Sequence, residues 1–229
     1  MAIITEFIRN PDIINNVIVN PPRRYKDLDT DIRLIEYSDT VQLSLSTQLD
    51  LVFWVPNQIS ICKSNRDVMS FNFSGCLMAK YKADNISNVA HIHCDSDFKD
   101  DCRGNFARFL INNKVNSNDL LLFRPLCDSY LYIPPEDSFN RRSVAGIITQ
   151  ENRCYSMVLE YDAMNRRCNL VSVYEHITHQ STRDNIYEAL MNFNINISRA
   201  DHNTQYIFEI ESRILIDIIE KNTLIYRWF

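Results

Sequence analysis

The chain has few glycines, no long apolar runs and no excess of positive charge. The first indicates where its glycines stand, and the other two argue against a membrane protein and a general nucleic-acid binder. Only 3 of its 229 residues are glycine, far below the usual ~7%, so we expect each glycine to stand where a side chain is not tolerated. Every apolar stretch is broken by polar residues well before the ~20 that a transmembrane helix needs, which argues against a membrane protein. Lys and Arg total 24 against 29 Asp and Glu, a formal charge of -5, which argues against a general nucleic-acid binder.

The N-terminal segment also lacks the features of a secretory signal peptide. It has no basic residues before an apolar core, and Glu6 interrupts the apolar stretch. We therefore expect a protein that acts in the cytoplasm, or one exported by a specialised route that leaves no such mark.

The cysteines form neither a CxxC pair nor a dense framework, which argues against a disulfide-stapled secreted domain. Their number is odd, so at least one thiol is free in a monomer. Most are expected to be small buried hydrophobes in a reducing compartment. The seven are Cys62, Cys76, Cys94, Cys102, Cys127, Cys154 and Cys168.

No repeat, low-complexity segment or Ser/Gly linker divides the chain, so residues 1–229 are treated as a single domain. Alternation of apolar and polar residues predicts strands through much of the first half. These stretches are 33–55, 58–62, 69–73, 76–82 and 86–95.

Helical spacing of apolar residues predicts helices over 97–113 and 181–193. Residues 154–176 are typical of a hairpin that turns near 163–165. For 206–221 the pattern fits a strand followed by a helix without deciding the boundary. Strands gathered early and helices interspersed later indicate a mixed α+β fold, not a regular βαβ repeat.

The segment SFNFSGC at 70–76 is the most informative in the chain, because a predicted strand runs into Ser-Gly-Cys. Such a turn can present the thiol of Cys76 at a sheet edge, with Gly75 allowing close approach of a substrate to the backbone. A nucleophilic cysteine needs an imidazole within hydrogen-bond reach, which lowers the pKa of the thiol and later protonates the leaving group. His91 follows Cys76 by 15 residues, a spacing that suits two adjacent antiparallel strands.

Hydroxyl and amide groups on the first predicted strand supply candidates for a third role. Ser70, Asn72 and Ser74 recur with period 2, so they are expected to share one face of that strand. A hydroxyl on that face can orient the imidazole through its other ring nitrogen.

These residues resemble the active site of the cysteine-dependent glutamine deamidases, which include the catalytic domain of cytotoxic necrotizing factor, Burkholderia lethal factor and the chemoreceptor deamidase CheD. Members carry Leu-Ser-Gly-Cys or a similar tetrapeptide and a His on a following strand. Here the tetrapeptide has Phe73 in place of Leu, and 90–92 is similar to the His strand. Some members have a Thr six residues before the nucleophile, where this chain has Ser70.

The resemblance implies a β-sandwich-like core of mixed sheets flanked by helices, in a toxin-like or effector-like enzyme. It implies Cys76 as nucleophile, His91 as acid and base, Ser70 in the orienting role, and backbone N–H groups of Ser74 and Gly75 around the oxyanion. The implied substrate is a glutamine of a target protein, such as a host GTPase or a translation factor. No metal, organic cofactor, nucleic acid or membrane is implied, and the enzyme is expected to be a monomer that acts in a host cytosol.

Three other interpretations remain open. A papain-like cysteine protease or amidase would use the same Cys-His pair. A non-enzymatic interaction protein, such as an immunity or viral accessory factor, would bury Cys76 as a core thiol. A metal site is a third, since several side chains near the predicted His strand are ligand types. These are His91, His93, Cys94, Asp95 and Cys102.

The remaining features predict ordinary structural roles. His176 and His179 have helical spacing and are expected to be solvated. Arg141-Arg142 and Arg166-Arg167 are expected at the surface. Aromatic side chains on the predicted strands are expected to pack in the core. These are Phe53, Trp54, Phe71 and Phe73.

Overall fold

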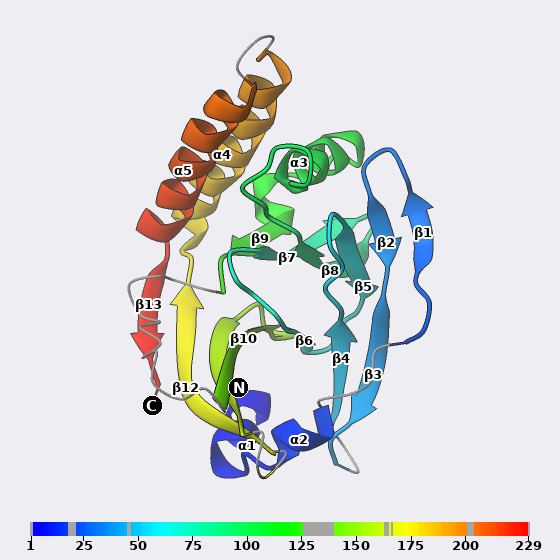
Figure 1. The fold of residues 1–229 in the computed structure, drawn as a ribbon, viewed down its shortest axis with the longest axis vertical. Coiled ribbons are helices and arrows are strands. Elements are labelled where there is room, and N and C mark those ends of the chain that lie inside the picture. The colour runs from blue at the N-terminus through cyan, green and yellow to red at the C-terminus, as the bar shows by residue number, and fades with distance from the viewer. Residues whose placement is uncertain are drawn as a thin grey trace.

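Two β-sheets form the centre of the molecule, with helices on the outer face of each (Figure 1). The structure is a computed structural model that describes residues 2–17, 22–44, 47–125, 140–162, 165, 167–200 and 204–228. The expected α+β class, with a β-sandwich-like core of mixed sheets flanked by helices, is confirmed.

The first sheet has six strands in the order β1-β2-β5-β8-β7-β9. All neighbours are antiparallel except β2 and β5, which are parallel. The strands are β1 (Lys26–Asp29), β2 (Leu34–Glu36), β5 (Ile59–Lys63), β7 (Leu77–Ala83), β8 (Ile86–Ile92) and β9 (Leu120–Phe123).

The second sheet has seven strands in the order β13-β12-β11-β10-β6-β4-β3. Its only parallel pair among the described residues is β4 with β6. The strands are β3 (Ser38–Gln42), β4 (Gln48–Val52), β6 (Val68–Ser70), β10 (Asn140–Ile148), β11 (Cys154–Asp162), β12 (Arg167–Ile177) and β13 (Leu224–Arg227). The pairing of β11 with β12 confirms the predicted hairpin.

The helices lie at opposite ends of the view in Figure 1, with α3, α4 and α5 beside the first sheet and α1 and α2 beside the second. Among the described residues, no helix is long and apolar enough to cross a bilayer. The helices are α1 (Ala2–Arg9), α2 (Ile13–Val17), α3 (Arg103–Asn112), α4 (Gln180–Ser198) and α5 (Thr204–Lys221), with a 3-10 turn at Ser117–Asp119.

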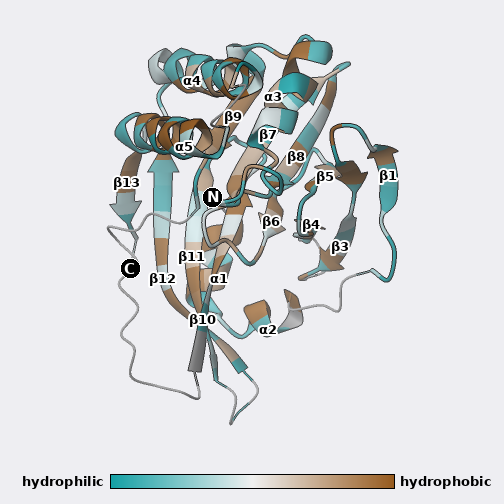
Figure 2. Ribbon diagram, turned by 45° about the horizontal axis from the view of Figure 1, so that its top comes forward, coloured by the Kyte–Doolittle hydropathy of each residue, from teal (hydrophilic) through white to brown (hydrophobic). Residues whose placement is uncertain are grey.

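Three apolar clusters correspond to the three interfaces between these layers. One packs α3, α4 and α5 on the first sheet, one packs α1 and α2 on the second, and the third fills the space between the sheets. Figure 2 shows the helices with hydrophobic residues on one side and hydrophilic residues on the other, as burial of a single helix face requires. The inter-sheet cluster contains Phe73, Cys76 and Met78, so the predicted nucleophile faces the second sheet.

A two-residue turn sets the register of β7 and β8. Asp84 and Asn85 have φ of 50° and 64°, and Ala83 pairs with Ile86 across them. Positive φ at both central residues is the geometry of a type I′ hairpin turn, which Asn and Asp tolerate. This turn joins the predicted strands 76–82 and 86–95 into a hairpin.

Local side-chain hydrogen bonds explain where the expected helix over 97–113 is wrong. The helix begins only at Arg103, because the preceding Asp side chains bind backbone N–H groups two residues further on. The carboxylates of Asp95, Asp97 and Asp101 accept from the N–H groups of residues 97, 99 and 103 at 2.9 Å each. Such turns compete with helical hydrogen bonds.

Two other expectations are also corrected. The strand predicted over 69–73 ends at Ser70, and Asn72 has φ of 64°, so Ser70, Asn72 and Ser74 do not share a strand face. Residues 206–221 belong to a single helix, α5, so a strand before the helix in this segment is wrong, and β13 follows the helix as a separate element.

Gly146 lies on β10, paired with Ser70 of β6. A Cβ at this position would lie 2.9 Å from Sδ of Met78, 2.9 Å from Cγ of Pro125 and 3.0 Å from Cε2 of Phe73. The expectation that glycine is placed where a side chain is not tolerated holds here for steric reasons.

We expect Gly146→Ala to lower the free energy of unfolding by about 1–3 kcal/mol, the usual cost of overpacking a core. Gly104→Ala is the matched control. Its Cβ would lie 2.8 Å from Cδ1 at the end of the flexible Ile197 side chain and 3.6 Å, an ordinary contact, from Oδ1 of Asn194, and alanine favours the helix by about 1 kcal/mol. Urea unfolding of both variants tests this, and an equal or larger loss in Gly104→Ala would contradict it.

Candidate active site

The hydroxyl of Ser70 joins the two sheets at the predicted site. Ser70 ends β6 in the second sheet, and its Oγ lies 2.7 Å from Nδ1 of His91 on β8 of the first sheet. The same Oγ donates to the carbonyl oxygen of Val52 at 2.7 Å. Ser70 and His91 are both buried, so the structure brings together the histidine and the hydroxyl that the sequence placed in the orienting role.

These two hydrogen bonds determine the tautomer of His91. A serine hydroxyl has one proton, and a carbonyl oxygen can only accept, so the proton of Ser70 goes to Val52. Nδ1 of His91 must then donate to Ser70, which leaves the lone pair of the neutral ring on Nε2. That Nε2 is buried and has no hydrogen-bond partner among the described residues.

The ring of His91 is held by stacking as well as by Ser70. Phe73 lies parallel to it, with ring centroids 4.1 Å apart and an interplanar angle of 6°. The backbone N–H of Phe73 donates to the carbonyl of Val144 at 3.1 Å, which fixes Phe73 to β10. Burial, with a contribution from nearby His93, lowers the pKa of His91 to about 3, so the ring is neutral near pH 7.

Cys76 lies on the same inner face, one residue before β7. Met78 pairs with His91 and Leu77 with Ile92, so extending the register sets Cys76 opposite His93 and diagonal to His91. The thiol is 2% exposed. Burial raises the pKa of Cys76, while the N–H groups of Cys94 and Trp54 lower it. The expectation that an imidazole lies within hydrogen-bond reach of this thiol and lowers its pKa is therefore wrong: Nε2 of His91 has no hydrogen-bond partner among the described residues, and burial outweighs the donors around the sulfur.

A second chain of contacts lies beside the thiol. Nε1 of Trp54 donates to Nδ1 of His93 at 3.1 Å, and Nε2 of His93 lies 3.4 Å from Oδ2 of Asp95. Because an indole N–H only donates, Nδ1 of His93 is unprotonated and the neutral ring carries its proton on Nε2, facing Asp95. Trp54, expected only to pack in the core, is thus a polar participant that the strand pattern did not reveal.

The turn before Cys76 opens to solvent. Ser74 is exposed and Gly75 half-buried, so the turn lies between the buried thiol and the surface. Gly75 has φ of 144°, a conformation that favours glycine, and a Cβ there would meet nothing within 4 Å. A glycine is therefore needed at position 75 because of the backbone conformation, and not because space is lacking.

Ser60 is a further residue that the sequence did not single out. It lies on β5 directly opposite His91, fully buried, and its Oγ has no hydrogen-bond partner among the described residues. Two unpartnered polar atoms, Oγ of Ser60 and Nε2 of His91, therefore belong to facing positions on neighbouring strands.

The structure also contains a second buried Ser–His pair, which corrects the expectation that His176 is solvated. His176 lies on β12, and its Nε2 contacts the Oγ of Ser156, which in turn donates to the carbonyl oxygen of Pro125. Because the hydroxyl proton of Ser156 goes to Pro125, Nε2 of His176 must donate to Ser156. His176 therefore carries its proton on Nε2, the opposite tautomer to that of His91. Burial lowers the pKa of His176 to about 3. His179 is exposed, as expected.

The ligand types near the His strand do not form a metal centre in the part of the chain that the structure describes. No group of three or more His, Cys, Asp or Glu side chains there is arranged to hold a metal ion. Nδ1 of His91 and Nδ1 of His93 are already engaged by Ser70 and Trp54. Cys127, one of the thiols considered above, lies outside the described residues.

Comparison with known proteins adds nothing to the resemblance, which rests on these residues alone. No protein-family model matches the chain, and no curated protein matches it in sequence.

The opposite tautomers of the two buried histidines are measurable by ¹⁵N NMR of the imidazole rings. We expect His91 protonated at Nδ1 and His176 at Nε2, with both rings neutral at pH 7. Ser70→Ala should remove the tautomer preference of His91 only, and Ser156→Ala should remove that of His176 only. The same tautomer in both rings would show that the assigned donor directions are wrong.

The lowered pKa values also predict how stability depends on pH. The folded pKa of His91 and of His176 is about 3, below the ordinary histidine pKa of 6.5. Between these values the unfolded chain binds protons that the folded chain does not, so stability is fully present above pH 6.5 and is lost as pH falls toward 3. The loss approaches about 1.4 kcal/mol per pH unit for each histidine.

Urea unfolding between pH 7 and pH 4 measures this slope. His176→Gln, which keeps a donor for Ser156, should have a shallower slope than the wild type. His179→Gln removes an exposed histidine and should leave the slope unchanged. Identical slopes in all three proteins would rule out the proposed titration of His176.

Proposed function

We propose that the protein is a cysteine-dependent glutamine deamidase that converts a glutamine side chain of a target protein to glutamate. The observation that carries the proposal is the pair of hydrogen bonds at Ser70, since they fix the lone pair of His91 on Nε2. A general base must present such a lone pair to the proton that it removes. Export by a specialised route and action in a host cytosol belong to the same proposal.

In the proposed reaction, Sγ of Cys76 attacks the carboxamide carbon while its proton passes to Nε2 of His91. The carbonyl oxygen becomes an oxyanion, held by backbone N–H groups of the Ser74–Gly75–Cys76 turn. Nε2 returns the proton to the departing nitrogen, which leaves as ammonia, and a thioester remains. Water then adds to the thioester as Nε2 takes its proton, and collapse of this intermediate frees glutamate and restores the thiol.

The surrounding residues support individual steps. Ser70 stabilises the imidazolium that forms transiently, because Nδ1–H already points at its oxygen. Phe73 keeps the ring in one plane. The N–H groups of Trp54 and Cys94 favour the thiolate of Cys76, offsetting part of the cost of burying its charge.

Burial limits how the substrate can enter. Cys76 and His91 are 2% and 1% exposed, whereas the adjoining Ser74 is exposed. The proposal therefore requires the glutamine side chain to approach over the Ser74–Gly75 turn and to displace part of it. A long, narrow carboxamide side chain suits that approach better than a folded backbone segment, which favours deamidation over proteolysis by a papain-like mechanism.

The alternative of a non-enzymatic interaction protein also has an observation in its favour. Ser70, Phe73, Cys76 and His91 are all buried, and the pKa of Cys76 is raised, as in a structural core. In that case the Ser70–His91 bond would serve only to join the sheets.

A proteomic assay separates these possibilities. Purified protein is incubated with a cell lysate, and mass spectrometry quantifies glutamines that have become glutamate, together with any new chain ends. We expect deamidation without cleavage, abolished in Cys76→Ser and reduced at least ~100-fold in His91→Ala, the lower end of general acid-base contributions. His93→Ala should reduce deamidation by less than about tenfold, because Nδ1 of His93 accepts a hydrogen bond from Trp54.

Cys62→Ser is the matched control, since Cys62 is a buried thiol of the same inter-sheet cluster. It should retain activity, and thermal unfolding of each variant distinguishes loss of chemistry from loss of fold. Equal modification by the wild type and Cys76→Ser would exclude the cysteine mechanism, and new chain ends would indicate a protease.

A further inference from the structure

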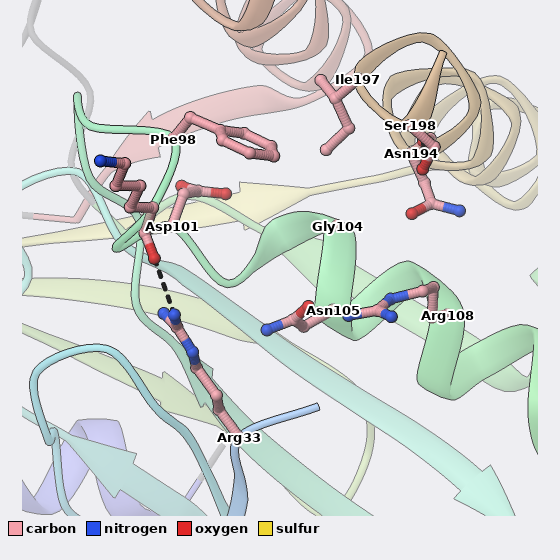
Figure 3. A pocket seen from close by; sticks show the side chains of 10 residues that line it. Arg33, Phe98, Asp101, Gly104, Asn105, Arg108, Asn194, Ile197 and Ser198 are labelled. Atoms are coloured by element: carbon pink, nitrogen blue, oxygen red, sulfur yellow. Dashed lines mark hydrogen bonds between the residues drawn. The ribbon is translucent and has the colours of Figure 1, made fainter. Parts of the chain in front are cut away.

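A polar pocket lies on the far side of the first sheet from Cys76. It is bounded by α3, the C-terminal part of α4, the turn between β1 and β2, and the segment before α3 (Figure 3). Its volume is about 600 Å³, within the range typical of small-molecule sites. The residues that line it are Arg33, Phe98, Lys99, Asp101, Gly104, Asn105, Arg108, Asn194, Ile197 and Ser198.

Three positively charged side chains line this pocket in a chain whose net charge is -5. Arg33, Lys99 and Arg108 line it from three different elements, and none of them has a salt bridge to a carboxylate among the described residues. Arg33 and Arg108 approach from opposite sides in Figure 3, with Asn105 between them. The side-chain oxygen of Asn105 accepts from Nη2 of Arg108.

Arg33 is held in place although its backbone is strained. Its φ is 57°, an uncommon conformation for a residue with a side chain. Nη2 donates to the carbonyl oxygen of Lys99 at 2.8 Å, and the guanidinium also lies near the thiol of Cys102, whose pKa it lowers against the effect of burial. Nη1 is buried with no hydrogen-bond partner among the described residues.

The carboxylate in the lining does not cancel this charge. Oδ2 of Asp101 accepts from Nε of Arg103 at 2.8 Å and from the N–H of Asp95 at 3.0 Å, and Oδ1 accepts from the N–H of Arg103 at 2.9 Å. Arg103 is itself not part of the lining, so it neutralises Asp101 from outside the pocket. The three cations therefore remain uncompensated.

We propose that this pocket binds the phosphate group of a small phosphomonoester. Two guanidiniums and an ammonium match a doubly charged, multi-oxygen anion, and guanidiniums bind phosphate through paired hydrogen bonds. The first turn of α3, at Gly104 and Asn105, adds the positive end of a helix dipole. Phe98 and Ile197 supply an apolar wall for the organic part of the ligand. The proposal does not depend on the proposed deamidase activity.

Calorimetric titration of the full chain with inorganic phosphate, phenyl phosphate and benzoate tests this. We expect phenyl phosphate to bind most tightly, because it adds contact with Phe98 and Ile197, and benzoate most weakly, because it has a single charge. Arg108→Ala should weaken phenyl phosphate binding about ten- to hundredfold, as loss of a hydrogen bond to a charged group implies. Arg108 is exposed on α3, so the substitution should not impair folding.

Arg213→Ala, which removes an exposed arginine of α5 outside the pocket, is the matched control and should bind as the wild type does. Thermal unfolding of each protein without ligand checks the fold. Absence of phosphate binding, equal affinity in Arg108→Ala and the wild type, or benzoate binding as tight as that of phenyl phosphate would each overturn the proposal.

Discussion

The structure around the candidate site depends on one hydroxyl, that of Ser70. Its two hydrogen bonds join a carbonyl of the second sheet to an imidazole of the first, so the spacing of the sheets and the orientation of His91 are set together. Phe73 can stack on that ring only because Gly146 leaves room beneath it. An isolated buried imidazole would cost free energy, and Ser70 reduces that cost by pairing one of its nitrogens.

Much of this site could be predicted because its members are close in sequence and chemically distinctive. Ser70, Cys76 and His91 lie within one stretch of alternating strands, where a hydroxyl, a thiol and an imidazole at suitable spacing are informative. The β7–β8 hairpin was predictable for the same reason, since its polar turn separates two alternating runs. The role of Cys76 as a nucleophile stays a prediction.

What could not be predicted depends on partners distant in sequence. Trp54 and His93 are 39 residues apart, and nothing in the apolar run around Trp54 indicates a hydrogen bond. His176 was expected to be solvated because its spacing to His179 suits a helix, whereas β12 buries it beside β11. Before α3, the apolar spacing was helical, but the aspartates bind local N–H groups and delay the helix.

The short turn at Asp84 and Asn85 has a consequence for how the site assembles. A hairpin of this kind forms in about 1–10 μs, well before distant strands pair. A slip of one residue in that hairpin would turn His91 to the helical side of the sheet. The face on which His91 meets Ser70 and Cys76 is thus set by the register of a local hairpin, which a two-residue turn determines.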